Sequence, residues 1–264
     1  MSSVVLGDIT VNYARHGSGP PVVLLHGLAE DHRSWDGVAD HLDEFTVYAL
    51  DLRGHGRTTA GEGTGTLSQL SDDLDAFLHA ETGPAAVVGY SLGGTIGLRA
   101  AAEPGTLISH LIAIATSSVV GSAAAEFFAG RIAQLEAGDA NGFAAGLRDD
   151  TAAQIVTPSD IDAVTARRLA AIGDGSGYIN AARAMIGLRS EPLNPLLEHV
   201  EVPVDVIGAS DDVFCPRRAS DIITERVTGS RYHEIAGAGH LISVDQPDAY
   251  GTLIARLLGE RQAA

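Results

Sequence analysis

A serine in this sequence stands in a setting that favours nucleophilic catalysis. Ser91 lies in the motif Gly89-Tyr90-Ser91-Leu92-Gly93, which follows a short apolar run and opens a helix-like stretch. Small residues at both ends of the motif allow a sharp turn from a strand into a helix, and this turn lifts the serine off the edge of a sheet. At a helix N-terminus, backbone N–H groups and the helix dipole favour a developing oxyanion. The motif therefore predicts that Ser91 is a nucleophile.

A serine hydroxyl is a weak nucleophile, so it needs a general base, and the base needs a carboxylate that orients it. The predicted base is His240, which lies in a glycine-rich loop after a strand-like run. The predicted carboxylate is Asp212, in a turn after another strand-like run, because it stands four residues before Pro216. Asp211 is the alternative at this doublet.

Two backbone N–H groups are expected to stabilise the oxyanion. Leu92 follows the nucleophile at the predicted helix start, and Leu28 follows His26-Gly27 at the end of an apolar run. Glycine lets the backbone approach a substrate closely. We therefore assign the oxyanion hole to the amides of Leu28 and Leu92. His26 is expected to pack or hydrogen-bond beneath the site without touching substrate.

The remaining histidines and the single cysteine show no metal-binding pattern. No H-E-x-x-H or similar spacing occurs, and a lone cysteine, Cys215, excludes an internal disulfide and any metal site built on several thiolates. Seven histidines are expected to be structural or exposed: His16, His32, His41, His79, His110, His199 and His233. We predict neither a metal nor an organic cofactor.

The three candidate catalytic residues each follow a predicted strand. Apolar, β-branched runs predict strands over Thr10–Arg15, Val22–Leu25, Thr46–Leu50, Ala86–Gly89, Leu107–Ala115, Pro203–Gly208 and Arg231–Ile235. Helices are predicted over Trp35–Leu42, Leu67–Ala80, Leu92–Ala102, Arg217–Val227 and Asp248–Leu258. This alternation predicts an α/β fold with a mostly parallel, doubly wound sheet. Ligands bind at the carboxyl ends of such strands, so the three residues are expected to meet there.

One region interrupts the alternation of strands and helices. From about Ser118 to about Glu198 the chain is alanine-rich and helix-like, with no convincing buried strand. It carries too many apolar residues to be a linker, which predicts a helical cap over residues 118–198 inserted into a core of residues 1–117 and 199–264. The predicted substrate-binding residues are its aromatic side chains Phe127, Phe143 and Tyr178, with Phe128 and Met185 as further candidates.

Together these motifs resemble the α/β-hydrolase fold over the whole chain. The matching pieces are His26-Gly27, Asp51-Leu52-Arg53-Gly54-His55-Gly56, Gly89–Gly94, Asp212 with Pro216, and Gly239-His240 with Gln246-Pro247. The order serine, aspartate, histidine is also that of this family. The resemblance implies a nucleophilic Ser91, a basic His240, an orienting Asp212 and a cap over the pocket. It also implies a structural role for the D-x-R-G-x-G loop.

Within that fold, the chain is similar to 3-oxoadipate enol-lactonases and related capped esterases and lactonases. The likeness rests on the Asp211-Asp212 doublet and on the run from Ala181 to Leu197. It implies a cap tryptophan, whereas the only tryptophan, Trp35, precedes the cap. It also implies a cation for a dicarboxylate-type substrate, for which the candidates are Arg131, Arg148, Arg183 and Arg189.

These observations predict a serine hydrolase of small carboxylic esters or lactones. Cofactor-free perhydrolysis and carbon–carbon bond hydrolysis on the same triad are alternatives, as is a small-molecule receptor that keeps the fold. A fold-level likeness does not decide between them. The triad argues against a haloalkane dehalogenase, whose nucleophile would be an aspartate where Ser91 stands.

The charge and apolar content of the sequence indicate which classes of binding partner to expect. The 264 residues include 34 acidic and 17 basic side chains, all of the latter arginine, which gives a formal net charge of −17. Nucleic-acid affinity depends on clustered positive charge, so a nucleic-acid partner is not expected. No uncharged apolar run approaches the roughly 18 residues of a membrane span, and the first residues lack a basic signal region. We expect a cytoplasmic enzyme with a small-molecule substrate. The sequence is compatible with a monomer or a homo-oligomer.

Overall fold

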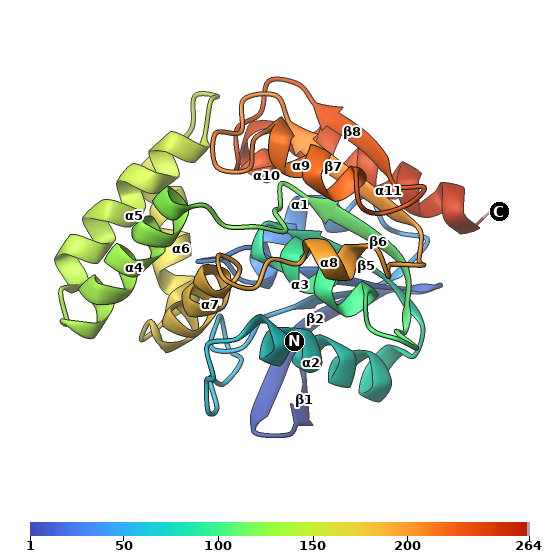
Figure 1. Cartoon of the computed structure of the whole chain (residues 1–264), viewed down its shortest axis with the longest axis horizontal. Coiled ribbons are helices and arrows are strands. Elements are labelled where there is room, and N and C mark those ends of the chain that lie inside the picture. The colour runs from blue at the N-terminus through green and yellow to red at the C-terminus, as the bar shows by residue number, and fades with distance from the viewer. Residues whose placement is uncertain (263–264) are drawn as a thin grey trace.

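A computed structural model describes residues 1–262 and forms one sheet from eight strands (Figure 1). The strands are β1 (Ser2–Leu6), β2 (Ile9–Gly17), β3 (Pro21–Leu25), β4 (Thr46–Leu50), β5 (Ala85–Tyr90), β6 (Ile108–Ile114), β7 (Val204–Ala209) and β8 (Arg231–Ile235). Their order across the sheet is β1-β2-β4-β3-β5-β6-β7-β8. The pairs β1–β2 and β2–β4 are antiparallel and all others are parallel. The predicted α/β fold with a mostly parallel sheet is confirmed.

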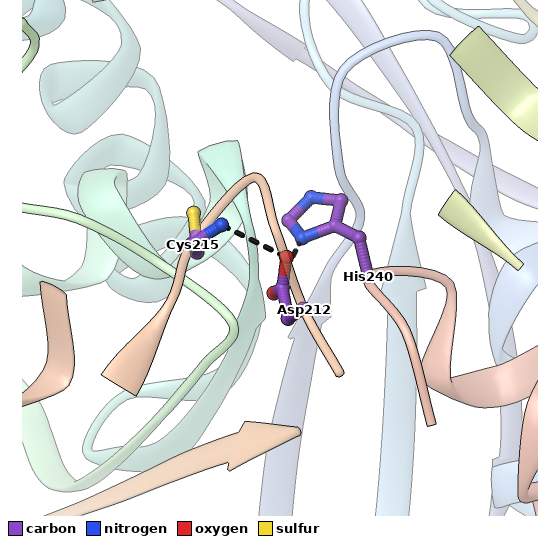
Figure 2. A group of neighbouring side chains, drawn as sticks. All are labelled: Asp212, Cys215 and His240. Atoms are coloured by element: carbon purple, nitrogen blue, oxygen red, sulfur yellow. Dashed lines mark hydrogen bonds and ion pairs between the residues drawn. The ribbon is translucent and has the colours of Figure 1, made fainter. Parts of the chain in front are cut away.

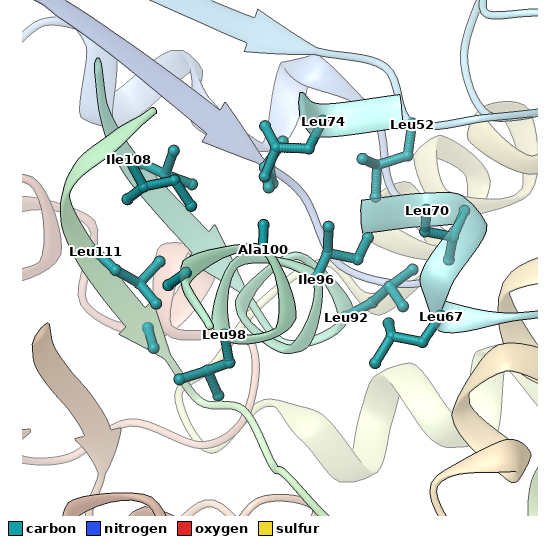
Figure 3. Packing of buried hydrophobic residues seen from close by; sticks show 14 of the residues in the cluster. Leu52, Leu67, Leu70, Leu74, Leu92, Ile96, Leu98, Ala100, Ile108 and Leu111 are labelled. Carbon is teal, nitrogen blue, oxygen red and sulfur yellow. The ribbon is translucent and has the colours of Figure 1, made fainter. Parts of the chain in front are cut away.

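Successive strand residues point to opposite faces of the sheet, and each face is covered by helices. In β3, Val23 and Leu25 pack in the core beneath α2 (Leu67–Phe77) and α3 (Leu92–Ala101). Val22 and Leu24 pack on the other face, against α1 (Asp36–Ala39) and α11 (Pro247–Gln262). Figure 3 shows the first of these cores, with apolar side chains of α3 beside those of α2. Burial on both faces explains the continuous apolar run of β3.

Several elements differ from the sequence-based expectation. The edge strand β1 is additional, and its exposed side chains (Val5 is 72% exposed) lack the apolar run of a buried strand. The helix predicted over 35–42 is instead a 3-10 turn, η1 (His32–Trp35), followed by the single turn of α1. A short helix, α10 (Ile242–Asp245), precedes α11, and α9 (Arg217–Thr224) ends before the predicted residue. The chain after α2 continues as a π-helical turn, Leu78–Thr82.

Five helices lie between β6 and β7. They are α4 (Ser122–Glu136), α5 (Ala140–Gln154), α6 (Ile161–Ile172), α7 (Ser176–Gly187) and α8 (Asn194–Leu197), called here the helical insertion. In Figure 1, α4 to α7 gather at one end of the molecule. They share a small apolar core that includes Phe143, Tyr178 and Ile172. None of the helices within residues 1–262 combines the length and apolarity needed to cross a membrane.

Candidate active site

Ser91 lies at the sharp turn between β5 and α3, at the carboxyl edge of the sheet. Its φ is 50°, a left-handed conformation that costs free energy in a residue other than glycine. The turn is held closely by its surroundings: the Ser91 N–H donates to the Ile114 carbonyl at 2.8 Å, and the Ser91 carbonyl accepts from the Thr116 hydroxyl at 2.7 Å. The strained backbone therefore fixes the direction of the serine side chain.

The two glycines of the motif are required by close packing. A Cβ on Gly93 would lie 2.2 Å from the carbonyl oxygen of Leu25, and a Cβ on Gly89 would lie 2.3 Å from the carbonyl oxygen of Gly93. Real Cβ atoms do not approach oxygen atoms this closely. Small residues here let α3 begin directly against β3 and β5, which brings the helix N-terminus to the serine.

The loops after β7 and β8 bring an aspartate and a histidine to Ser91. The Nε2 atom of His240 lies 3.1 Å from the Ser91 hydroxyl oxygen, and its Nδ1 atom lies 2.8 Å from Oδ2 of Asp212. Because a carboxylate only accepts, Nδ1 carries the hydrogen and Nε2 is left to accept from serine. The other oxygen of Asp212 accepts N–H groups of Phe214 and Cys215, both at 2.8 Å, and Figure 2 shows the carboxylate between the histidine ring and the Cys215 amide.

The environment of Asp212 keeps its carboxylate charged. Burial alone raises the pKa of this group, since only 4% of the residue is exposed. The charge and hydrogen bond of His240, together with the amides of Phe214 and Cys215, outweigh burial and lower the pKa below its ordinary value. A charged Asp212 orients the imidazole and stabilises its protonated form.

The two aspartates of the doublet have different surroundings. Asp211 is exposed, and its carboxylate accepts the hydroxyl of Ser210 at 2.6 Å. Its N–H donates to the carbonyl of Ala238, which ties this turn to the loop that carries His240. The structure thus brings Asp212, and not Asp211, to the histidine.

The two residues predicted to supply the oxyanion donors, Leu28 and Leu92, line the same cavity as Ser91. Leu92 is the first residue of α3, where N–H groups have no partner within the helix, and Leu28 follows β3 in a turn that includes Ala29 with a φ of 59°. A Cβ on Gly27 would lie 2.7 Å from the Tyr90 ring, so only glycine fits this turn. Leu28, Leu92 and Ser91 line one cavity.

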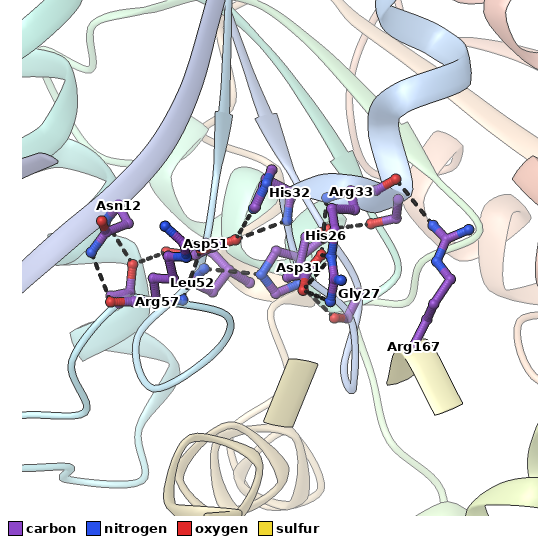
Figure 4. Close-up of polar contacts among 12 residues, drawn as sticks. Asn12, His26, Gly27, Asp31, His32, Arg33, Asp51, Leu52, Arg57 and Arg167 are labelled. Atoms are coloured by element: carbon purple, nitrogen blue, oxygen red, sulfur yellow. Dashed lines mark hydrogen bonds and ion pairs between the residues drawn. The ribbon is translucent and has the colours of Figure 1, made fainter. Parts of the chain in front are cut away.

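His26 supports this turn from below. The ring is completely buried; its Nδ1 donates to the Gly27 carbonyl at 2.8 Å and its Nε2 accepts the Leu52 N–H at 2.9 Å. Figure 4 shows this ring between the turn and the following loop. With both nitrogens used, His26 is a neutral support for the oxyanion turn, as the sequence predicts.

The D-x-R-G-x-G loop forms a polar support beside His26. Asp51 accepts N–H groups from His32 at 2.9 Å and from Arg57 at 2.9 Å, as Figure 4 shows. Arg53 forms paired hydrogen bonds to Asp8 and to Asp73. These contacts join four separate segments of the chain and leave no side chain of the network in the Ser91 cavity.

A cavity of about 540 Å³ opens above Ser91, and its far walls come from the helical insertion. Among the predicted lining residues, Phe127, Phe128, Tyr178 and Met185 do contribute to the walls. Phe143 does not. It is 2% exposed and packs edge-on against Tyr178, with ring centroids 5.2 Å apart, because its face of α5 turns toward the apolar core of the insertion.

The arginines expected to meet a dicarboxylate are engaged elsewhere. Within residues 1–262, Arg131 pairs with Asp150, Arg148 with Asp162, and Arg183 with Glu136. Arg189 contacts the hydroxyl of Ser122. None of the four contributes to the cavity wall. The cavity does contain charged residues that the sequence did not indicate, chiefly Glu30 and Arg168.

Two groups of side chains could offer metal ligands by proximity. Asp212, Cys215 and His240 have ligand atoms within 4.8 Å of one another, as do Asp31, His32 and Asp51. In both groups the carboxylates already accept hydrogen bonds from histidine, arginine or backbone N–H groups. The carboxylate oxygens of Asp212, Asp31 and Asp51 thus already accept hydrogen bonds from groups of the chain.

Comparison with known proteins agrees with this geometry. Residues 20–247 match the family model for the alpha/beta hydrolase fold. The chain belongs to the α/β-hydrolase family. A proposed carbamate hydrolase, RutD, of Escherichia coli O127:H6 is 26% identical over 262 residues, covering 94% of this chain and 96% of that protein.

Solved structures show the same fold. The enol-lactonase from Burkholderia xenovorans LB400 matches with a TM-score of 0.86 and 23% identity, covering 98% of this chain and 100% of that one. The esterase EaEST from Exiguobacterium antarcticum matches with a TM-score of 0.86 and 18% identity, covering 98% and 99%. The suspected membership of the α/β-hydrolase family is confirmed, and the chain is an enzyme of this family.

Proposed function

We propose that this α/β-hydrolase cleaves a carboxylic ester or lactone of a small molecule through an acyl-enzyme on Ser91. The observation that carries the proposal is the chain of contacts from the Ser91 hydroxyl to Nε2 of His240 at 3.1 Å and from Nδ1 to Asp212 at 2.8 Å. These contacts lie at the floor of a cavity with mainly apolar walls. The printed names of similar structures, an enol-lactonase and an esterase, support the same bond class.

In the first half of the reaction, the Ser91 oxygen attacks the substrate carbonyl carbon while Nε2 of His240 takes the hydroxyl proton. The carbonyl oxygen becomes an oxyanion, which the N–H groups of Leu28 and Leu92 stabilise. When the intermediate collapses, the bond to the leaving oxygen breaks, and that alkoxide takes the proton from Nε2. Asp212 stabilises the imidazolium throughout without taking its proton.

In the second half, a water molecule attacks the acyl carbon and passes a proton to Nε2 of His240. The second tetrahedral intermediate expels the Ser91 oxygen, which recovers the proton, and the carboxylic acid leaves. Each step uses only groups of this chain and water. We propose that the helical region over residues 118–198 acts as a cap, with Phe127 and Tyr178 contacting an aliphatic part of the substrate.

The test is hydrolysis of short 4-nitrophenyl esters and simple lactones by the wild type and by Ser91→Ala. We expect Ser91→Ala to lower kcat by about 10⁴-fold or more, because the nucleophile is removed. The matched control is Ser117→Ala, which changes a serine of the same cavity whose hydroxyl donates to the Val119 carbonyl. A fluorophosphonate probe is expected to label the wild type and the control, but not Ser91→Ala. Equal ester hydrolysis by the wild type and Ser91→Ala would contradict the proposal.

A further inference from the structure

The cavity that contains Ser91 shares part of its wall with a second, smaller cavity. The smaller cavity has a volume of about 170 Å³, and its walls come mainly from η1, α6 and α10. Glu30 and Arg168 are the two residues that contribute to both cavities. Glu30 lies in the loop after β3, whereas Arg168 lies on α6 of the helical insertion. The boundary between the cavities is therefore formed by one acidic and one basic side chain, from two separate parts of the chain.

Both boundary side chains are buried charges without an ion pair. Each residue is 8% exposed, and among residues 1–262 neither pairs with an opposite charge. One carboxylate oxygen of Glu30 accepts the N–H of Gly27 at 3.2 Å. Nη1 of Arg168 donates to the Thr151 hydroxyl at 2.9 Å, whereas its Nε atom is buried without a hydrogen-bond partner. Because the loss of hydration is only partly offset within the chain, both groups can still bind a ligand.

The other charged residues of the two cavity walls are either paired or exposed. Asp150 pairs with Arg131. Asp31 pairs with Arg33. The remaining charged residues of the walls are exposed to solvent: Asp36, Arg167 and Arg218. The boundary is therefore where a ligand meets buried charges of both signs that the chain leaves unpaired.

Both boundary charges lie close to the catalytic residues. The hydroxyl of Tyr90, the residue before Ser91, donates to the carbonyl of His240 at 2.9 Å. Burial raises the pKa of this hydroxyl strongly, the charge of Glu30 raises it further, and the charge of Arg168 lowers it. Because the interaction between charges declines with distance, both groups must be near the Tyr90 hydroxyl. The boundary therefore lies beside the floor of the Ser91 cavity.

The two charges determine which chemical group fits between them. A carboxylate only accepts hydrogen bonds, and a guanidinium only donates them. A hydroxyl or a primary carboxamide does both, so one such group can donate to Glu30 and accept from Arg168. A carboxylate on the ligand would be repelled by Glu30, and an ammonium group would be repelled by Arg168. The combination therefore favours a neutral polar group over an ion of either sign.

We propose that Glu30 and Arg168 form a polar subsite that binds a neutral hydroxyl or carboxamide group at one end of the substrate. This inference rests on the proposed ester or lactone hydrolysis at Ser91, and it gives both residues a role in specificity and none in bond cleavage. Apolar wall residues such as Phe127 contact the chain between that group and the reacting carbonyl. The substrate class differs from the dicarboxylate type that the enol-lactonase resemblance implies.

The experiment measures kcat/KM for esters that differ only in one terminal group. The first series contains ethyl esters of butanoic, hexanoic and octanoic acid, in which the terminal methyl group is kept or replaced by hydroxyl, carboxamide, ammonium or carboxylate. The second series carries the same groups at the end of the alcohol instead. Acid release is followed by titration at constant pH, after subtraction of the rate without enzyme.

The variants remove the two charges one at a time and together. Glu30→Gln removes the negative charge and keeps an oxygen that can accept the Gly27 N–H, and Arg168→Gln removes the positive charge. The double variant removes both. The matched controls are Glu136→Gln and Arg183→Gln, which each remove one charge from an exposed ion pair of the insertion that lines neither cavity.

For the wild type we expect hydroxyl- or carboxamide-terminated esters to exceed the methyl and both ionic esters by about tenfold in at least one series, since hydrogen bonds to charged groups are gained. Glu30→Gln is expected to raise the carboxylate-to-ammonium ratio of kcat/KM by about tenfold, and Arg168→Gln to lower it by about tenfold, mainly through KM, because each leaves one charge unbalanced. The double variant is expected to return this ratio to near the wild-type value. Both controls are expected to keep the wild-type ratio.

Two results would overturn the inference. One is a wild type that prefers the methyl group or an ion at every length and in both series, which tests the proposal without any variant. The other is a pair of single variants that change activity equally on all five terminal groups, since that pattern indicates structural charges. Each ratio compares substrates on one variant, so a smaller folded fraction leaves it unchanged. Failure of the proposed hydrolysis would show instead as equal activity of the wild type and Ser91→Ala on every ester.

Discussion

The adjacent aspartates 211 and 212 show how strongly a residue's role depends on the turn that carries it. Both follow β7 and both are carboxylates, yet only Asp212 is buried and meets the imidazole of His240. The amides of Phe214 and Cys215 hold its second oxygen, so the carboxylate has no freedom to turn away. The neighbouring Asp211 remains in solvent, with the Ser210 hydroxyl as its partner.

This contrast gives a prediction for a pair of isosteric variants. Asp212→Asn is expected to lower kcat by about 10⁴-fold, because an amide nitrogen facing Nδ1 of His240 favours the tautomer that cannot take the serine proton. Asp211→Asn is expected to stay within about threefold of the wild type, because an exposed carboxylate outside the site is changed. Steady-state hydrolysis of a 4-nitrophenyl ester measures both. Loss of activity in Asp211→Asn with retention in Asp212→Asn would reverse the assignment.

Single residues were predictable from the sequence where a backbone constraint accompanies the chemistry. Ser91 lies two residues from Gly89 and from Gly93, which the close packing of the turn requires. His240 directly follows Gly239 in the loop after β8. Phe143 was harder, because helical spacing cannot say whether an aromatic side chain faces the core of the insertion or the cavity. Arg168 gave no signal, because burial of a charged residue depends on how α6 packs against distant segments.

At the scale of elements, the catalytic turn depends on how closely α3 approaches β3. The approach is set by Gly93, where a Cβ would lie 2.2 Å from the carbonyl oxygen of Leu25. Apolar residues of α3, such as Ile96, then pack between the sheet and α2 (Figure 3). The serine, its oxyanion donor at Leu92 and the core of this face are thus positioned by the same helix.

Gly93→Ala is therefore expected to damage both stability and catalysis. The new methyl group requires α3 to move away from β3, which overpacks this region and costs about 1–3 kcal/mol of unfolding free energy. Activity is expected to fall by about 10²-fold or more, since a displacement of about 1 Å disturbs the reacting geometry. Urea denaturation and ester hydrolysis measure the two effects.

The control for this prediction is Gly130→Ala on α4, where a Cβ would meet nothing within 4 Å. Alanine is favoured over glycine within a helix by about 1 kcal/mol, so this variant is expected to be slightly more stable and equally active. A stable, fully active Gly93→Ala would show that α3 can shift without disturbing the serine turn.

The strand-and-helix alternation predicted the main elements because buried parallel strands and their covering helices have distinct apolar patterns. The prediction failed where burial is partial. In β1 the side chains are mostly exposed, so the sequence shows no apolar run that would indicate a strand. In the segment predicted as one helix over 35–42, the buried Trp35 ends the 3-10 turn η1, and α1 follows as a separate single turn. Apolar residues with helical spacing show that a segment packs against a core, but they do not fix its length in turns.

On the scale of the whole molecule, a buried carboxylate and its cationic and imidazole partners link strands β6, β7 and β8 away from the carboxyl ends that carry the active site. Asp205, near the start of β7, is completely buried and accepts hydrogen bonds from Arg231 and from the ring nitrogens of His110 and His233. These partners lie on β6 and β8, so one carboxylate links three neighbouring strands. The cluster stabilises the half of the sheet whose far ends carry Asp212 and His240.

The pKa of Asp205 gives the pH dependence of this contribution. Burial raises the pKa, but the hydrogen bonds from His110, Arg231 and His233 outweigh it, and the pKa falls well below the ordinary value of 3.8. A lowered pKa in the folded state means that the carboxylate stabilises the fold fully above the unfolded-state value. The contribution then declines as the pH falls below about 4 toward the folded-state pKa.

Asp205→Asn is therefore expected to lose about 3 kcal/mol of unfolding free energy at pH 7, because it leaves the guanidinium of Arg231 and the imidazoles of His110 and His233 without their buried charged partner. At pH 3 the difference from the wild type is expected to shrink, since the unfolded wild type then takes up a proton that the folded form resists. Urea denaturation at both pH values measures this change. Asp162→Asn, which removes an exposed pair with Arg148, is the control and is expected to cost less than about 1 kcal/mol at pH 7. An Asp205→Asn variant with the same loss at both pH values would show that shape and hydrogen bonding, rather than charge, give the cluster its strength.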